Sequence, residues 1–220
     1  MNIVILAAGQ GKRMKSALPK VLQTLAGRPL LEHVLATANQ LAGKTKTKPI
    51  VVIGHGASNI TAYLEQIQKE RPGFADAVTV MQKEQKGTGH ALLQALPKLD
   101  LDAPTLVLYG DVPLISKKTL MRLVTLADGK RGSDSALALL TQQMENPTGY
   151  GRILRDTEGA VRGIVEEKDA DYQQKSITEI NTGIMVLPSG RLKKWLKSLQ
   201  ASNAQGEYYL TDVIAMAARD

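Results

Sequence analysis

Short, continuous apolar runs alternate with longer amphipathic segments through the first half of the chain. The runs predict strands that are covered on both faces, and the amphipathic segments predict helices, because their apolar residues recur at helical spacing. The expected strands are 3–7, 50–53, 78–81 and 105–109. The expected helices are one that Pro29 opens and Gly43 follows, one capped by Ser58 and stopped by Pro72, one over 90–96 and one capped by Ser116. Strands and helices that alternate in this way require a mostly parallel sheet.

After about residue 130 the pattern changes, and strands follow one another more closely. The expected elements are strands over 135–141, 152–155, 160–165 and 179–187 and helices over 192–199 and 210–218. The second and third of these strands are predicted to form a hairpin around Thr157-Glu158-Gly159. Because no linker or repeat interrupts the chain, the sequence predicts one α/β domain over 1–220. Its fold would be a Rossmann-like mixed, mostly parallel sheet flanked by helices.

The composition is that of a globular protein, with 43% hydrophobic and 22% charged residues. No apolar run approaches the roughly 20 residues that a membrane span needs. The apolar start leads straight into glycines, so it is interpreted as a strand and not as a signal peptide. The chain has no cysteine, which excludes a disulfide framework and a thiolate metal site. We therefore expect a cytoplasmic protein.

The net charge of +7 suits an anionic partner. Nucleic acid is one candidate, but aromatic residues make up only 4% of the chain and offer little for base stacking. Many lysines stand in mixed segments such as 44–48, which indicates solvated faces more than a binding stripe. A small polyphosphate substrate is therefore expected, with neither nucleic acid nor membrane as a partner.

A glycine-rich loop after the first expected strand is the strongest chemical signal. The loop reads Leu6-Ala7-Ala8-Gly9-Gln10-Gly11-Lys12-Arg13-Met14, and Pro19-Lys20-Val21-Leu22 follows it. Backbone N–H groups in such a loop can approach phosphates closely, while Arg13 adds a bidentate cation and Lys20 a point charge. The alternative is a tight turn with solvated cations. Two cations at this spacing favour phosphate binding.

Two familiar phosphate-binding motifs are excluded. Met14 stands where a dinucleotide-binding loop would have its third glycine. The segment Gly43-Lys44-Thr45 imitates the end of a P-loop, but Ala38 stands at the first glycine position and the segment follows a helix.

Asp111 is the best candidate for a metal ligand. It comes at the carboxyl end of an expected buried strand, where ligands bind in open α/β sheets. A carboxylate at that place suits a hard cation that bridges nucleotide phosphates. The alternative is an aspartate that starts the turn before Pro113, and the phosphate loop upstream favours the metal. The histidines, His33, His55 and His90, show no metal or triad spacing, so structural or solvated roles are expected for them.

Further motifs follow in order along nearly the whole chain. They are Gln82-x-x-Gln85-x-Gly87-Thr88-Gly89-His90-Ala91, Tyr109-Gly110-Asp111-Val112-Pro113-Leu114, Asn146-Pro147-Thr148-Gly149-Tyr150-Gly151-Arg152-Ile153, Ile164-Val165-Glu166, Glu179-Ile180-Asn181-Thr182-Gly183 and Gly206-Glu207-Tyr208-Tyr209-Leu210-Thr211-Asp212. With the glycine loop they resemble the sugar-1-phosphate nucleotidyltransferase family, and within it the uridylyltransferase half of the bifunctional GlmU proteins. The resemblance implies a fold of the nucleotide-diphospho-sugar transferase type, with a nucleotide-binding half over about 1–112 and a sugar-binding half over about 113–220.

The resemblance also implies roles for individual residues. The catalytic residues would be Arg13, Lys20 and Asp111, with Asp111 holding Mg²⁺. The uridine pocket would be formed by Ala8, Gly9, Gln82, Gly87 and Thr88. The amide of Gln82 could both donate and accept, as the imide edge of uracil requires. The sugar would be bound by Gly151, Glu166 and Asn181. Further substrate contacts would come from Leu6, Ala7, Gly11, Tyr109 and Gly110. From the sequence alone, Glu166 would instead be an exposed strand charge beside Glu167 and Lys168.

The implied reaction transfers UMP from UTP to N-acetylglucosamine 1-phosphate by in-line attack and releases pyrophosphate. Its product, UDP-N-acetylglucosamine, would serve the synthesis of peptidoglycan and lipopolysaccharide precursors. Three alternatives stay open: another sugar 1-phosphate, dTTP in place of UTP, or a non-catalytic relative that binds nucleotide sugars.

The chain departs from the family pattern in three ways. The family's second half is a hexapeptide-repeat β-helix that acetylates the sugar amine; because no such repeat is present, acetyltransferase activity is not expected and a monomer is. The family also completes its Mg²⁺ site with an asparagine beyond residue 220, so weak metal binding and a truncated chain are expected. Lys12 stands where the family commonly has threonine.

Overall fold

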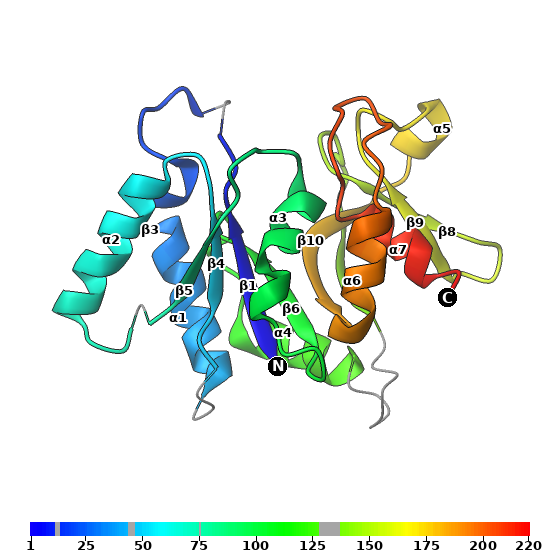
Figure 1. The fold of residues 1–220 in the computed structure, drawn as a ribbon. Helices are drawn as coiled ribbons and strands as arrows, with labels where there is room; N and C mark the ends of the chain where they lie inside the picture. The colour runs from blue at the N-terminus through cyan, green and yellow to red at the C-terminus, as the bar shows by residue number, and fades with distance from the viewer. Residues whose placement is uncertain (12–13, 44–46, 75, 128–136) are drawn as a thin grey trace.

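The structure, a computed structural model, describes residues 1–11, 14–43, 47–74, 76–127 and 137–220. Within these residues an eight-stranded mixed sheet runs through the molecule in the order β5-β4-β1-β6-β10-β8-β9, with β7 paired to β10 (Figure 1). The parallel strands are β1 (Asn2–Ala7), β4 (Ile50–Ile53), β5 (Val78–Met81) and β6 (Thr105–Tyr109). The antiparallel strands are β7 (Ala138–Gln143), β8 (Arg152–Arg155), β9 (Val161–Val165) and β10 (Glu179–Leu187). The predicted mixed α/β fold is confirmed.

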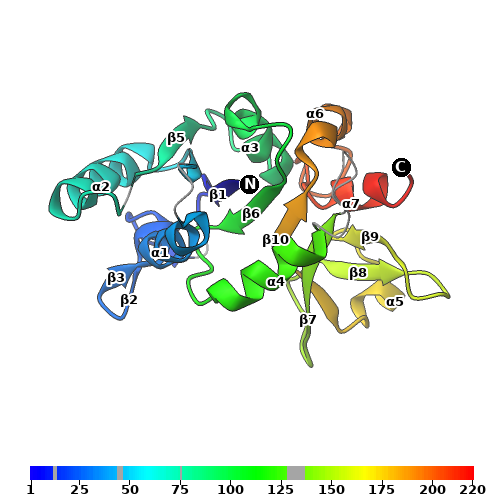
Figure 2. The ribbon, with the colours of Figure 1, turned by 90° about the horizontal axis from the view of Figure 1, so that it is seen from below.

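Helices cover both faces of the sheet (Figure 2). One face packs against α1 (Leu30–Ala42), α2 (Ala57–Glu70) and α4 (Lys117–Ala127). The other face packs against α3 (Thr88–Ala95), α6 (Ser189–Ser198) and α7 (Asp212–Ala217). Side chains of β1 alternate between the two cores, and Ile5 enters the first while Val4 enters the second. Every residue of β1 is therefore buried, as its continuous apolar run predicts.

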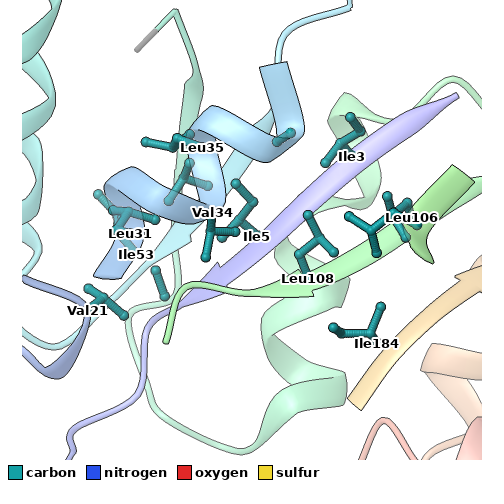
Figure 3. Close-up of a cluster of buried hydrophobic side chains, with 14 of the residues drawn as sticks. Ile3, Ile5, Val21, Leu31, Val34, Leu35, Ile53, Leu106, Leu108 and Ile184 are labelled. Atoms are coloured by element: carbon teal, nitrogen blue, oxygen red, sulfur yellow. The ribbon is translucent and has the colours of Figure 1, made fainter. Parts of the chain in front are cut away.

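The helix α1 anchors the start of the candidate site. Its residues Leu31, Val34 and Leu35 are fully buried and face the β1 side chain Ile5 (Figure 3). Burying one such side chain stabilises the fold by about 1.5–3 kcal/mol. Val21, which follows the glycine loop, joins the same cluster. The segment after the loop is therefore fixed to the core.

Several element boundaries coincide with the sequence prediction. The strands β4, β5, β6, β8 and β10 have the predicted bounds. Ser116 caps α4 as expected, because its Oγ accepts a hydrogen bond from the Thr119 N–H at 3.1 Å. The expected hairpin between β8 and β9 forms, and the Asp156 N–H donates to the Ala160 carbonyl across its turn at 3.0 Å.

The predicted cap of α2 is wrong. The helix begins at Ala57, one residue before Ser58, and Gly56 is the N-cap residue in a left-handed conformation. A Cβ atom on Gly56 would lie 2.3 Å from Cγ of Pro19. The glycine is therefore required twice, by its φ of 68° and by the close approach of Pro19.

Some short elements were not predicted. They are the hairpin strands β2 (Thr24–Leu25) and β3 (Arg28–Pro29), the 3-10 turns η2 (Lys20–Leu22) and η3 (Leu96–Lys98), and α5 (Tyr172–Lys175). The helix expected over 90–96 begins two residues earlier, at Thr88. The first residues of the strand expected over 135–141 lie outside the described part of the chain. No described helix has the length and apolar character to cross a membrane.

Candidate active site

The four parallel strands end at one edge of the sheet, the upper edge in Figure 1. The segments that follow them carry most of the predicted site residues. Main-chain bonds hold these segments together: the Gly110 N–H donates to the Leu6 carbonyl at 2.9 Å, and the Gln82 N–H donates to the Ile53 carbonyl at 2.7 Å. The carboxyl edge of a parallel sheet is the usual ligand-binding place in such folds. Leu6 and Ala7 themselves pack their side chains into the two cores, so any contact they make with a ligand is through the main chain.

Lys20 and Asp111 meet at this edge. The Lys20 Nζ lies 2.6 Å from the Asp111 Oδ2, and the two side chains are 40% and 25% exposed. Lys20 begins the 3-10 turn η2, in which Val21 and Leu22 are buried. Because its neighbours are fixed in the core, Lys20 projects toward the edge. A Cβ atom on Gly110 would lie 3.1 Å from Cγ1 of Val21, so the glycine lets Asp111 come close to η2.

Gly9 is open to ligands. It is exposed, its φ is not positive, and a Cβ placed on it would meet nothing within 4 Å. Every other described glycine has either a positive φ or a neighbour within 4 Å of that position. No contact or backbone strain within the described part of the fold therefore requires glycine here. The space beside Gly9, which no described residue fills, is the kind of cradle that a phosphate occupies.

Position 11 of the loop, in contrast, requires glycine. Gly11 has a φ of 58°, and a Cβ on it would lie 2.9 Å from the Lys20 Cβ, so the loop packs on Lys20. Arg13, predicted to be catalytic, and Lys12 fall outside the described residues.

Gln82 lies at the same edge and is buried, with only 3% of its surface exposed. Its Nε2 donates to the Gly87 carbonyl at 3.1 Å and lies 3.0 Å from the Nδ1 of His90. A Cβ on Gly54 would meet both Ala8 and the Gln82 carbonyl oxygen within 3.0 Å, so Gln82 is adjacent to the glycine loop. The amide nitrogen is committed within the protein, so the expected donation from Gln82 to a base is not available while these bonds hold.

Thr88 and Tyr109 connect the predicted nucleotide-binding residues with the predicted sugar-binding residues. The Thr88 Oγ1 accepts from the Leu210 N–H at 3.0 Å and also bonds to the Tyr109 hydroxyl. Burial raises the pKa of Tyr109, and the carboxylates of Glu166 and Asp111 raise it further. The Tyr109 phenol is therefore close to both carboxylates and stays protonated at physiological pH.

The predicted sugar-binding residues are brought together. The Asn181 N–H donates to the Gly151 carbonyl at 2.8 Å, and a Cβ on Gly151 would lie 3.3 Å from the Glu166 Oε2. Glu166 accepts from the Thr211 hydroxyl at 2.9 Å. Burial raises the pKa of the Glu166 carboxyl, and the nearby carboxylate of Asp212 acts in the same direction, while the bond from Thr211 lowers it. Glu166 is half-buried, so the alternative of an exposed strand charge is wrong.

A buried ion pair beside these residues was not predicted. The Arg152 Nη2 lies 2.7 Å from the Glu167 Oε2, and Arg152 is only 1% exposed. The guanidinium also donates to the Tyr150 carbonyl, and the same Glu167 oxygen accepts from the Gly149 N–H at 3.1 Å. The pair therefore fixes the loop that precedes Gly151. Arginine is rarely buried, and an arginine at a strand start carries no sequence signal of burial.

The described residues include no group of three or more histidine, aspartate or glutamate side chains that could hold a metal ion. Asp111, the predicted metal ligand, is paired with Lys20, and Gly11 of the glycine loop packs on Lys20. A cation held by Asp111 would take its other oxygen ligands from water and a bound substrate.

Residues 3–177 match the model of the MobA-like NTP transferase domain. The chain belongs to the MobA-like NTP transferase family. This NTP transferase is 54% identical over 217 residues to the bifunctional protein GlmU of Paraburkholderia phymatum, which covers 99% of the chain and 44% of that protein. It is 54% identical over 220 residues to the bifunctional protein GlmU of Cupriavidus necator, which covers 100% of the chain and 45% of that protein. The chain thus spans less than half the length of these relatives.

Solved structures confirm the fold of this NTP transferase. A crystal structure of a UDP-glucose pyrophosphorylase complexed with UDP-glucose superposes with a TM-score of 0.75 at 18% identity, covering 100% of the chain and 87% of that protein. The apo form of a UDP-glucose pyrophosphorylase gives a TM-score of 0.73 at 17% identity, covering 100% and 88%. These structures show the fold, and the match to the family model places the chain among the MobA-like NTP transferases.

Proposed function

We propose that this NTP transferase transfers UMP from UTP to N-acetylglucosamine 1-phosphate, giving UDP-N-acetylglucosamine and pyrophosphate. The observation that carries the proposal is the meeting of Lys20 and Asp111, at 2.6 Å, at the sheet edge that also carries the open Gly9 loop. A cation, a carboxylate and an exposed glycine loop at one edge suit a metal-bound triphosphate. The 54% identity to GlmU proteins supports the choice of uridine nucleotide and sugar.

The reaction needs no base or nucleophile from the protein. A sugar 1-phosphate already carries close to two negative charges at neutral pH, because its second pKa is about 6. One of its oxygens attacks the α-phosphorus of UTP, the bond to the β-phosphate breaks, and pyrophosphate leaves. The protein's task is to bring two anions together and to stabilise charge on the transferring group.

Lys20 fits this task. Its side chain is anchored by η2 but 40% exposed, so the ammonium can exchange Asp111 for phosphate oxygens without refolding. We assign Lys20 to the α-phosphate and the sugar phosphate, and the loop N–H groups beside Gly9 to the leaving pyrophosphate. Arg13 is proposed to act on the pyrophosphate as well.

Asp111 is the proposed ligand for Mg²⁺. This cation is usually held by one or two carboxylates together with substrate phosphates, not by an all-protein cage. The donor set fits that pattern, because Asp111 supplies a hard oxygen and the described residues offer no cluster of three ligands. When bound, the cation would neutralise phosphate charge in the transition state.

The sugar is proposed to lie against Gly151, Glu166 and Asn181. The Asn181 Oδ1 accepts from the Gly183 N–H at 2.9 Å. The amide NH₂ of Asn181 is therefore the group that can donate to a sugar hydroxyl or acetyl oxygen. Glu166 supplies an acceptor for hydroxyl groups. We place this reaction in the cytoplasm, as a source of cell-envelope precursors.

A substrate panel with pyrophosphate detection tests the proposal. UTP, dTTP, CTP, ATP and GTP are each paired with N-acetylglucosamine, glucose and galactose 1-phosphates, with Mg²⁺ or with a chelator. The highest turnover is expected for UTP with N-acetylglucosamine 1-phosphate, and none with the chelator. Preference for another pair of substrates would identify the protein as a different nucleotidyltransferase. Binding of a nucleotide sugar without pyrophosphate release would identify it as a non-catalytic relative.

A further inference from the structure

Gln82 has little freedom in this structure. Both hydrogens of its amide nitrogen have protein partners: the Gly87 carbonyl at 3.1 Å, and the Nδ1 of His90 at 3.0 Å. The Gly87 contact fixes which end of the amide is nitrogen, because a carbonyl oxygen can only accept. The part of the amide that remains for a ligand is its oxygen, which is an acceptor.

The contact with His90 fixes where that histidine carries its proton. The Gln82 nitrogen donates, so Nδ1 must accept and the neutral ring carries its hydrogen on Nε2. The His90 Nε2 lies 3.2 Å from the Gln94 Nε2. Both atoms would then be donors, so they could not form a hydrogen bond with each other. The Gln94 Nε2 also donates to the His90 carbonyl at 3.1 Å, and turning the Gln94 amide would break that bond. Gln94 is only half-buried on α3, however, whereas Gln82 is buried, and an unsatisfied buried group costs more than one that water can reach. The Gln82 contact therefore decides the tautomer.

Other contacts hold His90 in place. It is the third residue of α3, whose first residue, Thr88, accepts from the Leu210 N–H at 3.0 Å. The His90 ring lies 6.4 Å from the ring of Tyr208, between centroids. The Tyr208 carbonyl in turn accepts from the Gly89 N–H at 2.9 Å. The acceptor that His90 presents to Gln82 is therefore a fixed part of the fold.

We infer that His90 is a positioning residue that orients the Gln82 amide and thereby selects a base with an imide N–H. This inference rests on the proposed function, in which Gln82 faces the base of the nucleotide. Uracil and thymine carry a hydrogen on N3 that the Gln82 oxygen can accept. Cytosine carries a lone pair on N3, so two acceptors would face each other. The Gln82 amide, oriented by His90, therefore favours UTP and dTTP over CTP.

Substitutions of His90 test the inference through the ratio of kcat/KM for UTP to that for CTP. In His90→Phe the Gln82 amide loses one of its two acceptors and keeps only the Gly87 carbonyl, so it is held less firmly in this orientation and the ratio is expected to fall about tenfold or more. The change is expected as a rise in KM for UTP, with KM for the sugar phosphate unchanged. In His90→Asn the side-chain oxygen lies near the former Nδ1, so the ratio should stay within about threefold of the wild-type value.

Two controls separate positioning from folding. Gln94→Ala removes the other side-chain partner of His90 and is expected to leave the ratio unchanged. Circular dichroism checks that each variant is folded. A ratio in His90→Phe equal to that of the wild type, or a loss of selectivity in Gln94→Ala, would overturn the inference.

Nitrogen NMR of the histidine-labelled protein gives a readout that does not depend on turnover. The chain has three histidines, so the His90 signals are assigned by their absence from His90→Phe. The expected form is the neutral ring with its proton on Nε2, and a proton on Nδ1 would refute the orientation of Gln82. If the wild type turns over no nucleotide, the proposed function fails. If the wild type turns over UTP and CTP equally well, only the role of His90 is contradicted.

Discussion

The ammonium of Lys20 and the carboxylate of Asp111 are in direct contact, at 2.6 Å, although one follows β1 and the other follows β6. These strands are neighbours in the sheet and run parallel, so the loops after them share one edge. The pair holds opposite charges at the place where the proposed reaction brings a cation and phosphates. Neither charge is deeply buried, so substrate can replace each partner at small cost.

Removing either member of this pair is expected to abolish most turnover. Lys20→Ala loses a cation on the transferring phosphate, and Asp111→Asn loses the charged metal ligand. Removing one such stabiliser typically lowers kcat by about 10²–10³. Initial rates of pyrophosphate release by the folded variants measure the effect.

The matched control is Lys48→Ala, which removes an exposed lysine that pairs with Asp76 at 2.7 Å. Its rate is expected to equal that of the wild type. A rate near the wild-type value in Lys20→Ala would contradict the role of Lys20, and the same result in Asp111→Asn would contradict that of Asp111.

Gly9→Ala is expected to separate binding from stability. The backbone conformation suits alanine and the new methyl group meets no atom of the described residues within 4 Å, so the free energy of unfolding should change by less than about 1 kcal/mol. If a phosphate occupies the space, KM for UTP should rise at least tenfold, by roughly 1.4 kcal/mol of lost binding. Denaturant unfolding and steady-state kinetics measure the two effects, and an unchanged KM would remove Gly9 from the binding loop.

Glu167→Gln tests whether the buried ion pair supports the sugar side. The new amide oxygen can still accept from Gly149, but Arg152 loses its counter-charge while remaining buried. The free energy of unfolding is expected to fall by about 1–3 kcal/mol. KM for the sugar phosphate should rise several-fold while KM for UTP stays constant, because the loop before Gly151 loses its anchor.

Arg155→Gln is the control for that change. Arg155 lies on β8 with Arg152 and pairs with Glu179 at 2.7 Å, but its own side chain is 42% exposed. Such pairs contribute about 0–1 kcal/mol. If Arg155→Gln raised KM for the sugar phosphate as much as Glu167→Gln does, the effect would belong to the hairpin as a whole.

The pKa of Glu166 predicts a pH dependence of stability. Burial raises this pKa above its ordinary value of 4.5. The folded state therefore binds more protons than the unfolded state between the two values, and stability falls as the pH rises through that window. Above this window Glu166 is ionised in both states, and its ionised form destabilises the fold.

Glu166→Gln removes this effect and keeps an oxygen for the Thr211 hydroxyl. Its Tm at pH 7 is expected to exceed that of the wild type by about 2–4 °C, and the difference should vanish near pH 4. KM for the sugar phosphate should rise at the same time. Thermal unfolding across pH measures the first effect, and an equal Tm difference at both pH values would exclude the titration of Glu166 as its cause.

The parallel half of the fold and the edge that carries the site could be predicted from the sequence. Buried strands such as β4 and β6 are continuous apolar runs, and alternation with amphipathic helices leaves few arrangements. Parallel strands end at one edge, so residues that follow them must come together. Asp111 could be assigned to this edge in that way, whereas the place of Gln82 in the site was expected from the family resemblance.

Only the tertiary structure decided which atoms meet there. Burial of Arg152, the orientation of the Gln82 amide and the contact of Lys20 with Asp111 depend on segments far apart in the chain. The position of β10 between β6 and β8 likewise follows from antiparallel pairing, which no local pattern specifies. Periodicity reports which face of an element is buried, and it contains no information about which polar groups that burial brings within hydrogen-bond distance.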